Sequence, residues 1–286
     1  MNSVSKKKLG YVFVVVSVCL YSFSDAIMKY FIQSYGVNQI VFLRTMCRFI
    51  PLMCFAYYKK INPAQTKRVG ENIFRSVLAC FGTYAFMAAY EYASMVDVIV
   101  VGYTTAIFVI PLSVLLLNEK FYVRDAVAVV VGFFGILLAF RPGIGIFQFG
   151  ILFAVIGAVI SALNQVIIKR LSFTDSEFTI IFYHHVTLLL SSVVLGFSGF
   201  SKLFFADTVY IIIGGIIGAI AQYCMIHAFK LSTSSHLASA TYTMLIPATI
   251  LDFVIYDKVP DFFIIGGLIL ISLGSFWVIS ARSRQK

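Results

Sequence analysis

The sequence predicts an all-α polytopic membrane protein whose ten transmembrane helices form a 5+5 inverted repeat. Its 286 residues are 60% hydrophobic and only 12% charged, whereas an ordinary soluble domain is about 45–50% apolar and about 25% charged. The mean hydropathy is +0.96, and a globule of 31.9 kDa has no core large enough for so much apolar surface. We therefore expect the lipid bilayer to be the solvent of this chain.

Ten apolar stretches account for the expected helices. A transmembrane helix needs about 20 mostly apolar residues, so ten helices use about 200 positions and leave short connections. None of these connections is long enough for a soluble domain. The expected spans are residues 9–31, 38–58, 73–92, 97–117, 124–141, 148–168, 178–198, 209–229, 236–256 and 261–281.

The first span follows three consecutive lysines, Lys6 to Lys8, an arrangement that also begins secretory signals. The apolar run continues through Asp25 to Phe31 without a small-x-small cleavage site. We therefore expect a retained first span.

Lysine and arginine are unevenly distributed between alternate connections. With the N-terminus in the cytoplasm, sixteen of the 22 lie in inner segments, Arg75 among them, and three lie outside. The remaining three, Lys29, Arg44 and Arg48, fall within spans or at their rims. Because cytoplasmic connections carry an excess of positive charge, we expect a multi-pass protein of a bacterial inner membrane with both termini cytoplasmic.

The charge and cysteine patterns argue against several functions. The formal net charge is +10, but nucleic-acid binding needs cations gathered on one solvated surface, and here they punctuate apolar runs. The five cysteines lie inside apolar runs without a paired metal spacing, which is typical of packing residues. We expect no nucleic-acid partner, no metal and no cofactor.

Catalytic motifs are not found in the sequence. It contains no G-x-S-x-G, no H-E-x-x-H and no glycine-rich phosphate loop. Asp25 and Asp252 offer an acid–base pair in principle, but the G-x-G-D pattern of intramembrane aspartyl proteases is absent. We expect a protein that is not an enzyme, with an intramembrane enzyme as an alternative.

An internal repeat relates the two halves of the chain. A shift of 140 residues superposes Lys29 on Lys169 and residues 40–42 (Ile-Val-Phe) on 180–182 (Ile-Ile-Phe). Later pairings drift to offsets of 136 to 139, which indicates small insertions. The sequence therefore predicts two five-helix repeats.

The repeats are expected at residues 1–145 and 146–286. Because five is an odd number, the second repeat enters the membrane with the opposite orientation. Inverted repeats around a midplane site are the common architecture of carriers that open alternately to the two sides. The sequence thus predicts alternating access.

Charged residues inside the first two spans are candidates for substrate binding, because an ionisable group in hydrocarbon costs at least about 2.5 kcal/mol. Tyr21, Asp25 and Lys29 share one helix face, so Asp25 and Lys29 can pair directly. Arg44 and Arg48 share a face of the second span. Arg48 lies near mid-depth and needs a carboxylate, carbonyls, water or an anionic ligand group, and the alternative is that one of these arginines pairs with Asp25.

The second half repeats this pattern with side chains that are mostly neutral hydrogen-bonding groups. Ser161, Gln165 and Lys169 reproduce the spacing of Tyr21, Asp25 and Lys29, and Arg44 becomes His184. We expect two polar gates around a central cavity. For the tyrosines the alternative is packing, and for Glu91 it is a solvated rim. The further candidates for the cavity lining are Tyr84, Glu91, Tyr103, Asn164, Gln222, Tyr223, His227 and Tyr242.

Four residues are candidates for proton coupling: His184, His185, His227 and Asp252. Adjacent histidines point about 100° apart on a helix, so His184 and His185 make a poor metal site. Asp252 has a second interpretation, as the partner of a basic residue from the first half.

The chain resembles the drug/metabolite transporter superfamily, in particular its EamA-type ten-span carriers. The residues that carry this resemblance are Lys29, 42–44 (Phe-Leu-Arg), Arg75, Pro111 with Glu119, and Gly132. In the second half Asp257 follows Pro247 by ten positions rather than eight. The resemblance implies a 5+5 bundle with a central cavity that moves small metabolites without ATP.

Within that superfamily, the second to fifth spans look most like the S-adenosylmethionine uptake carriers of intracellular bacteria, although Arg48 departs from them. Asp25 facing an ammonium or sulfonium, and Arg44 or Arg48 facing a carboxylate, would suit an amino-acid-like zwitterion. The alternatives are an exporter of aromatic amino acids or other metabolites and a non-transporting membrane scaffold. The sequence leaves both a monomer and a homodimer open.

Overall fold

All regular structure in the described part of the chain is helical. The computed structural model describes residues 3–35, 37–93, 95–140, 149–196, 200–256 and 262–281. The helices are α1 (Ser3–Tyr35), α2 (Val37–Tyr58), α3 (Val69–Tyr92), α4 (Met95–Tyr103), α5 (Thr105–Leu117), α6 (Val123–Phe140), α7 (Phe149–Leu171), α8 (Glu177–Gly196), α9 (Phe205–Leu231), α10 (Ser234–Thr241), the 3-10 turn η2 (Tyr242–Met244), α11 (Leu245–Tyr256) and α12 (Phe262–Ala281).

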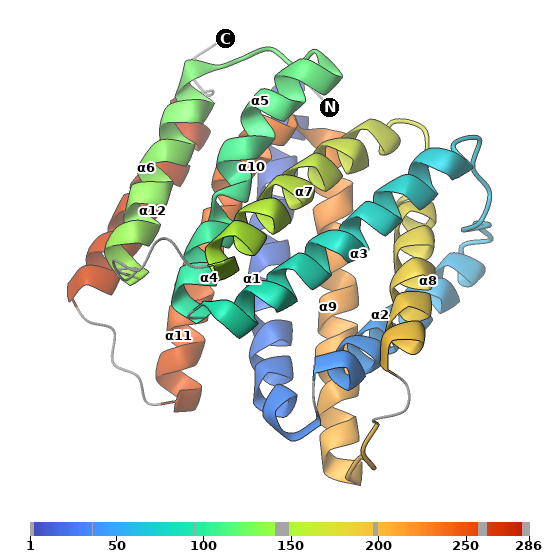
Figure 1. Cartoon of the computed structure of the whole chain (residues 1–286). Coiled ribbons are helices and arrows are strands. Elements are labelled where there is room, and N and C mark those ends of the chain that lie inside the picture. Colours follow the sequence, from blue (N-terminus) through green and yellow to red (C-terminus); the bar gives the residue numbers. More distant parts are fainter. Residues whose placement is uncertain are drawn as a thin grey trace.

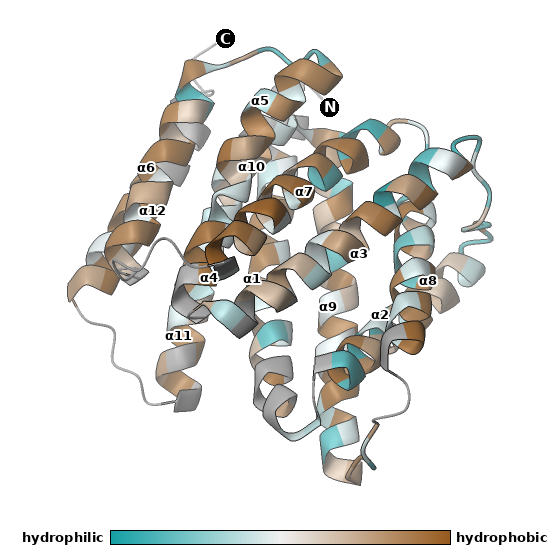
Figure 2. Cartoon of the chain, in the orientation of Figure 1, coloured by the Kyte–Doolittle hydropathy of each residue, from teal (hydrophilic) through white to brown (hydrophobic). Residues whose placement is uncertain are grey.

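These helices form ten segments that match the ten expected spans, because α4 with α5 and α10 with α11 each occupy one span. Within the described residues, six segments are long and apolar enough to cross a membrane, and Leu237–Leu251 and Phe262–Leu273 are shorter apolar helices. Hydrophobic residues run along the helices, while hydrophilic ones gather at the connection between α2 and α3 and at helix ends (Figure 2). The all-helical membrane fold is confirmed.

Two segments are broken near their middle. The hydroxyl Oγ1 of Thr104 donates to the Val101 carbonyl at 2.6 Å, and the Ile107 N–H bonds to the Thr104 carbonyl at 2.8 Å. The Tyr103 carbonyl therefore lacks the hydrogen bond that the Ile107 N–H would donate to it in a continuous α-helix. Threonine hydroxyls of this kind compete with the backbone ladder and bend helices. The apolar run from residue 97 to 117 did not indicate this break.

The ninth segment is interrupted by η2. Thr241 donates its hydroxyl to the Ala238 carbonyl, and Thr243 donates to Ala240, both at 2.7 Å. The two broken segments meet at their breaks, where the Tyr242 hydroxyl donates to the Tyr103 carbonyl at 3.2 Å. The Tyr242 hydroxyl thus replaces a backbone N–H as the hydrogen-bond donor to the Tyr103 carbonyl.

The helices pack mainly in pairs, with α1 along α9, α3 along α7 and α6 along α12 (Figure 1). In the last pair Gly135 and Gly267 face each other, and a Cβ on either would meet the other's carbonyl oxygen within 2.8 Å. The two backbones can approach this closely only without side chains. In addition α2 packs on both α8 and α9.

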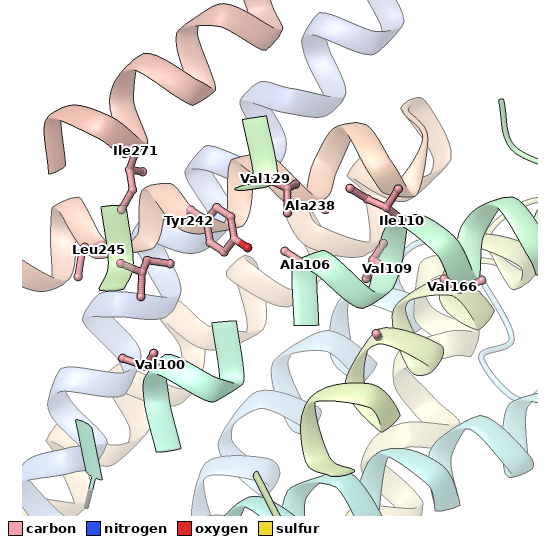
Figure 3. Close-up of a cluster of buried hydrophobic side chains, with 12 residues drawn as sticks. Val100, Ala106, Val109, Ile110, Val129, Val166, Ala238, Tyr242, Leu245 and Ile271 are labelled. Atoms are coloured by element: carbon pink, nitrogen blue, oxygen red, sulfur yellow. The ribbon is translucent and has the colours of Figure 1, made fainter. Parts of the chain in front are cut away.

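The largest apolar cluster lies where α5, α6, α10 and η2 meet. Tyr242 sits in its centre with 1% of its surface exposed, surrounded by Val129, Leu245 and Ile271 (Figure 3). A Cβ at Gly132 would lie 2.5 Å from the Tyr242 ring, so this glycine leaves room for the tyrosine. The core therefore fixes the position of the second helix break.

The start of α1 and the end of α12 lie at the same end of the bundle, here named the terminus-bearing end (Figure 1). The end of α1 and the start of α9 lie at the opposite end (Figure 1).

Candidate functional site

Asp25 of α1 and Arg44 and Arg48 of α2 form one cluster in the half toward the opposite end. Arg44 Nη2 lies 2.6 Å from Asp25 Oδ1, and Arg48 Nη2 lies 3.8 Å from the same oxygen. Asp25 therefore pairs with Arg44, the alternative that the sequence left open. Lys29, its other possible partner, has a side chain outside the described part of the structure.

Arg48 is the more deeply buried of the two arginines. Its Nη2 donates to Ser24 Oγ at 2.9 Å, and its guanidinium lies 5.3 Å from the centre of the Tyr21 ring. A Cβ at Gly218 would lie 2.2 Å from Arg48 Nε, so the α9 backbone makes room for the guanidinium. Its Nε has no hydrogen-bond partner among the described residues.

The side chains of this cluster are only partly buried. The side chains of Asp25 and Arg44 are 38% and 32% exposed, while that of Arg48 is 10% exposed. Asp25 belongs to an apolar helix of membrane-spanning length. Its paired oxygen Oδ1 is buried, and the exposed part of its side chain is accessible to a ligand. The arrangement offers one anion beside two cations on the walls of α1 and α2.

The helix breaks lie next to this cluster. Tyr103 is close enough to Asp25 for the carboxylate charge to act on its hydroxyl, and the rings of Tyr103 and Tyr242 meet edge to face at 5.9 Å. Broken helices near mid-depth are a recurrent feature of transporter binding sites. Both tyrosines, expected in the cavity lining, thus lie at the place where the helices are discontinuous.

A third arginine lies nearer the terminus-bearing end. Arg75 is 2% exposed, although the sequence analysis counted it among the inner charges of the connections. It donates to Asn164 Oδ1 at 3.3 Å and to the Ile180 carbonyl at 2.8 Å. The sequence did not predict this burial, which places Asn164 beside a guanidinium. The sequence signal was Arg75 at the third position of an expected span.

The two adjacent histidines of α8 differ in their partners. His185 is 2% exposed, stacks on Phe49 and has its Nδ1 3.0 Å from the Ile181 carbonyl. His184 Nδ1 is buried and has no hydrogen-bond partner among the described residues. The Nδ1 atom of His185 therefore has a hydrogen-bond partner, whereas that of His184 has none among the described residues.

Lys169 and Glu119 hold the link between α9 and α10. Lys169 Nζ donates to the carbonyls of Phe229 and, at 2.6 Å, of Ser232, which close the C-terminal end of α9. The carboxylate of Glu119 accepts the Ser234 N–H at 3.1 and 3.2 Å, at the first residue of α10. A cation at a helix C-terminus and an anion at an N-terminus both stabilise the helix dipole.

The end of α5 directs Glu119 toward this link. Asn118 ends the helix with φ of 52°, in the left-handed region that asparagine tolerates. Lys169 also lies over the Phe173 ring at 4.5 Å. We name Glu119, Lys169 and the backbone of 229–234 the α9–α10 clasp.

His227 belongs to an ion cluster between α8 and α9. Its Nδ1 lies 2.8 Å from Glu177 Oε1, and Lys230 Nζ lies 2.8 Å from Glu177 Oε2. The His227 ring packs against Phe13 and stacks on Tyr223. Sequence reasoning missed Glu177, whose position in the first turn of α8 looked like part of a connection.

A further acidic residue that was missed is Asp175, in the connection before α8. It is 7% exposed and accepts from Thr66 Oγ1 and, at 2.6 Å, from Asn72 Nδ2. These bonds tie the α7–α8 connection to the start of α3, so Asp175 holds two connections together.

The remaining candidates are less constrained. The Tyr84 hydroxyl donates to Ser191 at 3.4 Å, which links α3 to α8. Gln165 and Gln222 are half-buried and make no side-chain hydrogen bond to the described residues. The side chains of Glu91 and Asp252 lie outside the described part. No group of three metal-ligating side chains gathers among the residues described.

An apolar helical bundle with broken helices and charges on its spanning segments is typical of polytopic membrane transporters. The EamA-like transporter family matches residues 8–141 and again 148–280, so the chain belongs to that family. The resemblance seen in the sequence is thereby confirmed, and the chain is a multi-pass membrane protein of a transporter family.

Similar proteins include carriers with a named substrate. An S-adenosylmethionine uptake transporter of Rickettsia prowazekii (strain Madrid E) is 22% identical, over 100% of this chain and 97% of the relative. That of Rickettsia conorii (strain ATCC VR-613 / Malish 7) is 24% identical over 99% and 97%. An uncharacterized transporter of Clostridium kluyveri is 27% identical over 98% and 95%.

One solved crystal structure of another protein superposes with a TM-score of 0.83. It covers 97% of this chain and 99% of that chain at 16% identity, which establishes a shared fold.

Proposed function

We propose that this protein is a secondary transporter that moves a small zwitterionic, amino-acid-like metabolite across a bacterial inner membrane by alternating access. The observation that carries the proposal is Asp25, whose side chain is 38% exposed, beside Arg44 and Arg48. A zwitterion matches both signs of this cluster at once.

Binding follows as an exchange of partners. The ammonium or sulfonium of the substrate takes the place of Arg44 on Asp25, and the released Arg44, with Arg48, receives the substrate carboxylate. Charge-assisted bonds to carboxylates are about twice as strong as neutral ones. Because the Asp25–Arg44 ion pair is intact before binding, neither of these two charges is left unpaired when the site is empty.

S-adenosylmethionine is the substrate that we propose. It carries an ammonium, a sulfonium and a carboxylate, and the Rickettsia relatives are named as its uptake transporters. The aromatic groups near the cluster, Tyr21 and Tyr103, offer faces for its adenine and for its cationic sulfonium.

Alternating access rests on the two inverted repeats, 1–145 and 146–286. The family matches the chain twice, at 8–141 and 148–280. Helix contacts exchange under the same relation, since α1 packs on α9 as α7 packs on α3, and α2 packs on α9 as α8 packs on α3. Two nearly equivalent halves have two nearly equal openings, one to each side.

The terminus-bearing end is the cytoplasmic end in this proposal. Positive charge is concentrated in the segments assigned to it, and the start of α1 and the end of α12 lie there. The Asp25 cluster then lies toward the outer face, and the α9–α10 clasp toward the cytoplasm.

Counterflow in proteoliposomes tests this function. Vesicles loaded with unlabelled S-adenosylmethionine should accumulate the labelled compound without ATP, and protein-free vesicles should not. Excess decarboxylated S-adenosylmethionine should compete far less than S-adenosylhomocysteine, because it lacks the carboxylate. Absence of counterflow would refute S-adenosylmethionine as the substrate.

Export of aromatic amino acids is the second candidate. The edge-to-face pair of Tyr103 and Tyr242 at the helix breaks favours it, because aromatic substrates stack on such faces. Counterflow with labelled phenylalanine, and none with S-adenosylmethionine, would favour this candidate.

A further inference from the structure

Arg75 is a buried cation whose partners are all neutral. Its guanidinium bonds to Asn164 Oδ1 on α7, to the Ile180 carbonyl on α8 and to Ser76 Oγ on its own helix. These are three of the five N–H donors that a guanidinium offers. Among the described residues, no carboxylate pairs with it.

A guanidinium cannot become neutral by losing its proton, so a buried Arg75 keeps its charge. Neutral acceptors compensate this charge only in part, and buried arginines are usually paired with an acid. The second arginine of this kind, Arg48, has Asp25 within 3.8 Å. The compensating anion for Arg75 is therefore not supplied by the described chain.

Two buried atoms beside Arg75 lack hydrogen-bond partners. Arg75 Nε and His184 Nδ1 are both without one among the described residues, and the positive charge of Arg75 acts on the His184 ring. Arg48 acts on the same ring. The buried His184 ring thus lies within the electrostatic reach of both arginines.

We propose that Arg75, Asn164 and His184 form a second binding station for the carboxylate of the transported zwitterion, used when the carrier opens toward the terminus-bearing end. The inference rests on the proposed function. Arg75 Nε and His184 Nδ1 are both buried in this conformation. The substrate carboxylate therefore reaches them only after α3 and α8 move apart. The substrate carboxylate then passes from Arg48 to Arg75 as the outer side closes.

A purely structural brace between α3, α7 and α8 is the competing explanation. A brace stabilises the bundle equally for every ligand. A carboxylate station discriminates between ligands that differ only in that group, and it does so from one side of the membrane.

The test measures affinity from each side in vesicles of known orientation. The probes are S-adenosylmethionine and decarboxylated S-adenosylmethionine, with phenylalanine and phenethylamine as a second pair that differs in the same group. The variants are Arg75→Gln and Arg75→Lys. Arg170→Gln is the matched control, because Arg170 lies at the same end of the bundle but is 56% exposed and pairs with Glu71.

The proposal predicts that Arg75→Gln weakens binding of the carboxylate probe from the cytoplasmic side by at least about tenfold, while the carboxylate-free probe and the outer side change little. Arg75→Lys should recover part of the loss, and Arg170→Gln should match the wild type. Equal losses for both probes would identify a brace and overturn the proposal.

The two probe pairs separate this inference from the proposed substrate. If the wild type binds phenylalanine but not S-adenosylmethionine, the substrate proposal fails, and the Arg75 station is decided with the phenylalanine pair. A wild type that folds but does not prefer the acid of either pair overturns the station.

Discussion

The bundle holds two groups of charged side chains in opposite ways. In the Asp25 cluster the charges face one another, and Asp25 and Arg44 keep about a third of their side-chain surface exposed. In the α9–α10 clasp, Lys169 and Glu119 bind backbone groups at helix ends, and Lys169 is 5% exposed. A charge paired with a charge can exchange its partner for a ligand, whereas a charge on helix ends is released only when the helices separate.

Among the variants that test this comparison, Arg48→Met is expected to have the largest effect on transport. Methionine fills similar space, and Asp25 keeps Arg44, so the protein should fold with a melting temperature close to that of the wild type. Transport should be abolished, because the buried cation for the substrate carboxylate is lost. Unchanged counterflow would exclude Arg48 from binding.

Asp25→Asn should be the next largest effect on transport. The amide keeps the shape and removes the charge that receives the substrate cation. We expect a loss of affinity of roughly 10- to 100-fold, the range for a charge-assisted hydrogen bond. Titration calorimetry with S-adenosylmethionine measures it, and an affinity within twofold of the wild type would place the cation elsewhere.

Lys169→Met should act mainly on stability. The variant leaves the C-terminal carbonyls of α9 without a donor, which costs about 2 kcal/mol. A thermal melt in detergent should show a lower midpoint, while ligand affinity measured below that midpoint should stay near the wild-type value. A ligand-specific defect without a lower midpoint would move Lys169 into the binding site.

Glu119→Gln should have the smallest effect. Glutamine still accepts the Ser234 N–H but loses the favourable interaction with the α10 dipole, worth about 0.3–1 kcal/mol. The melting midpoint should fall by less than in Lys169→Met. A larger fall than that of Lys169→Met would contradict our assignment of the clasp.

The sequence predicted the ten segments well, because a length of apolar residues is sufficient to define a membrane helix. It also identified Asp25, Arg44 and Arg48, since charges in an apolar run stand out. It did not predict the helix breaks at Thr104 and Tyr242, because neither residue type is a strong helix breaker in sequence.

Residues close to helix ends were harder to interpret. Arg75, Asp175 and Glu177 lie where a span meets a connection, and the sequence does not distinguish a solvated charge there from a buried one. Lys169 was expected in the cavity, but its acceptors are 60 and 63 residues further along the chain. Only the packing of α7 against the end of α9 brings them together.

The central claim is that a zwitterion is held by Asp25 and the arginines beside it. Thermal stabilisation by S-adenosylmethionine tests it most directly, since a ligand at 100 times its Kd adds about 2.7 kcal/mol to the folded state. At the same ligand concentration we predict a raised melting midpoint for the wild type, a clearly smaller rise for Asp25→Asn and none for Arg48→Met. Equal stabilisation of all three proteins would contradict the claim.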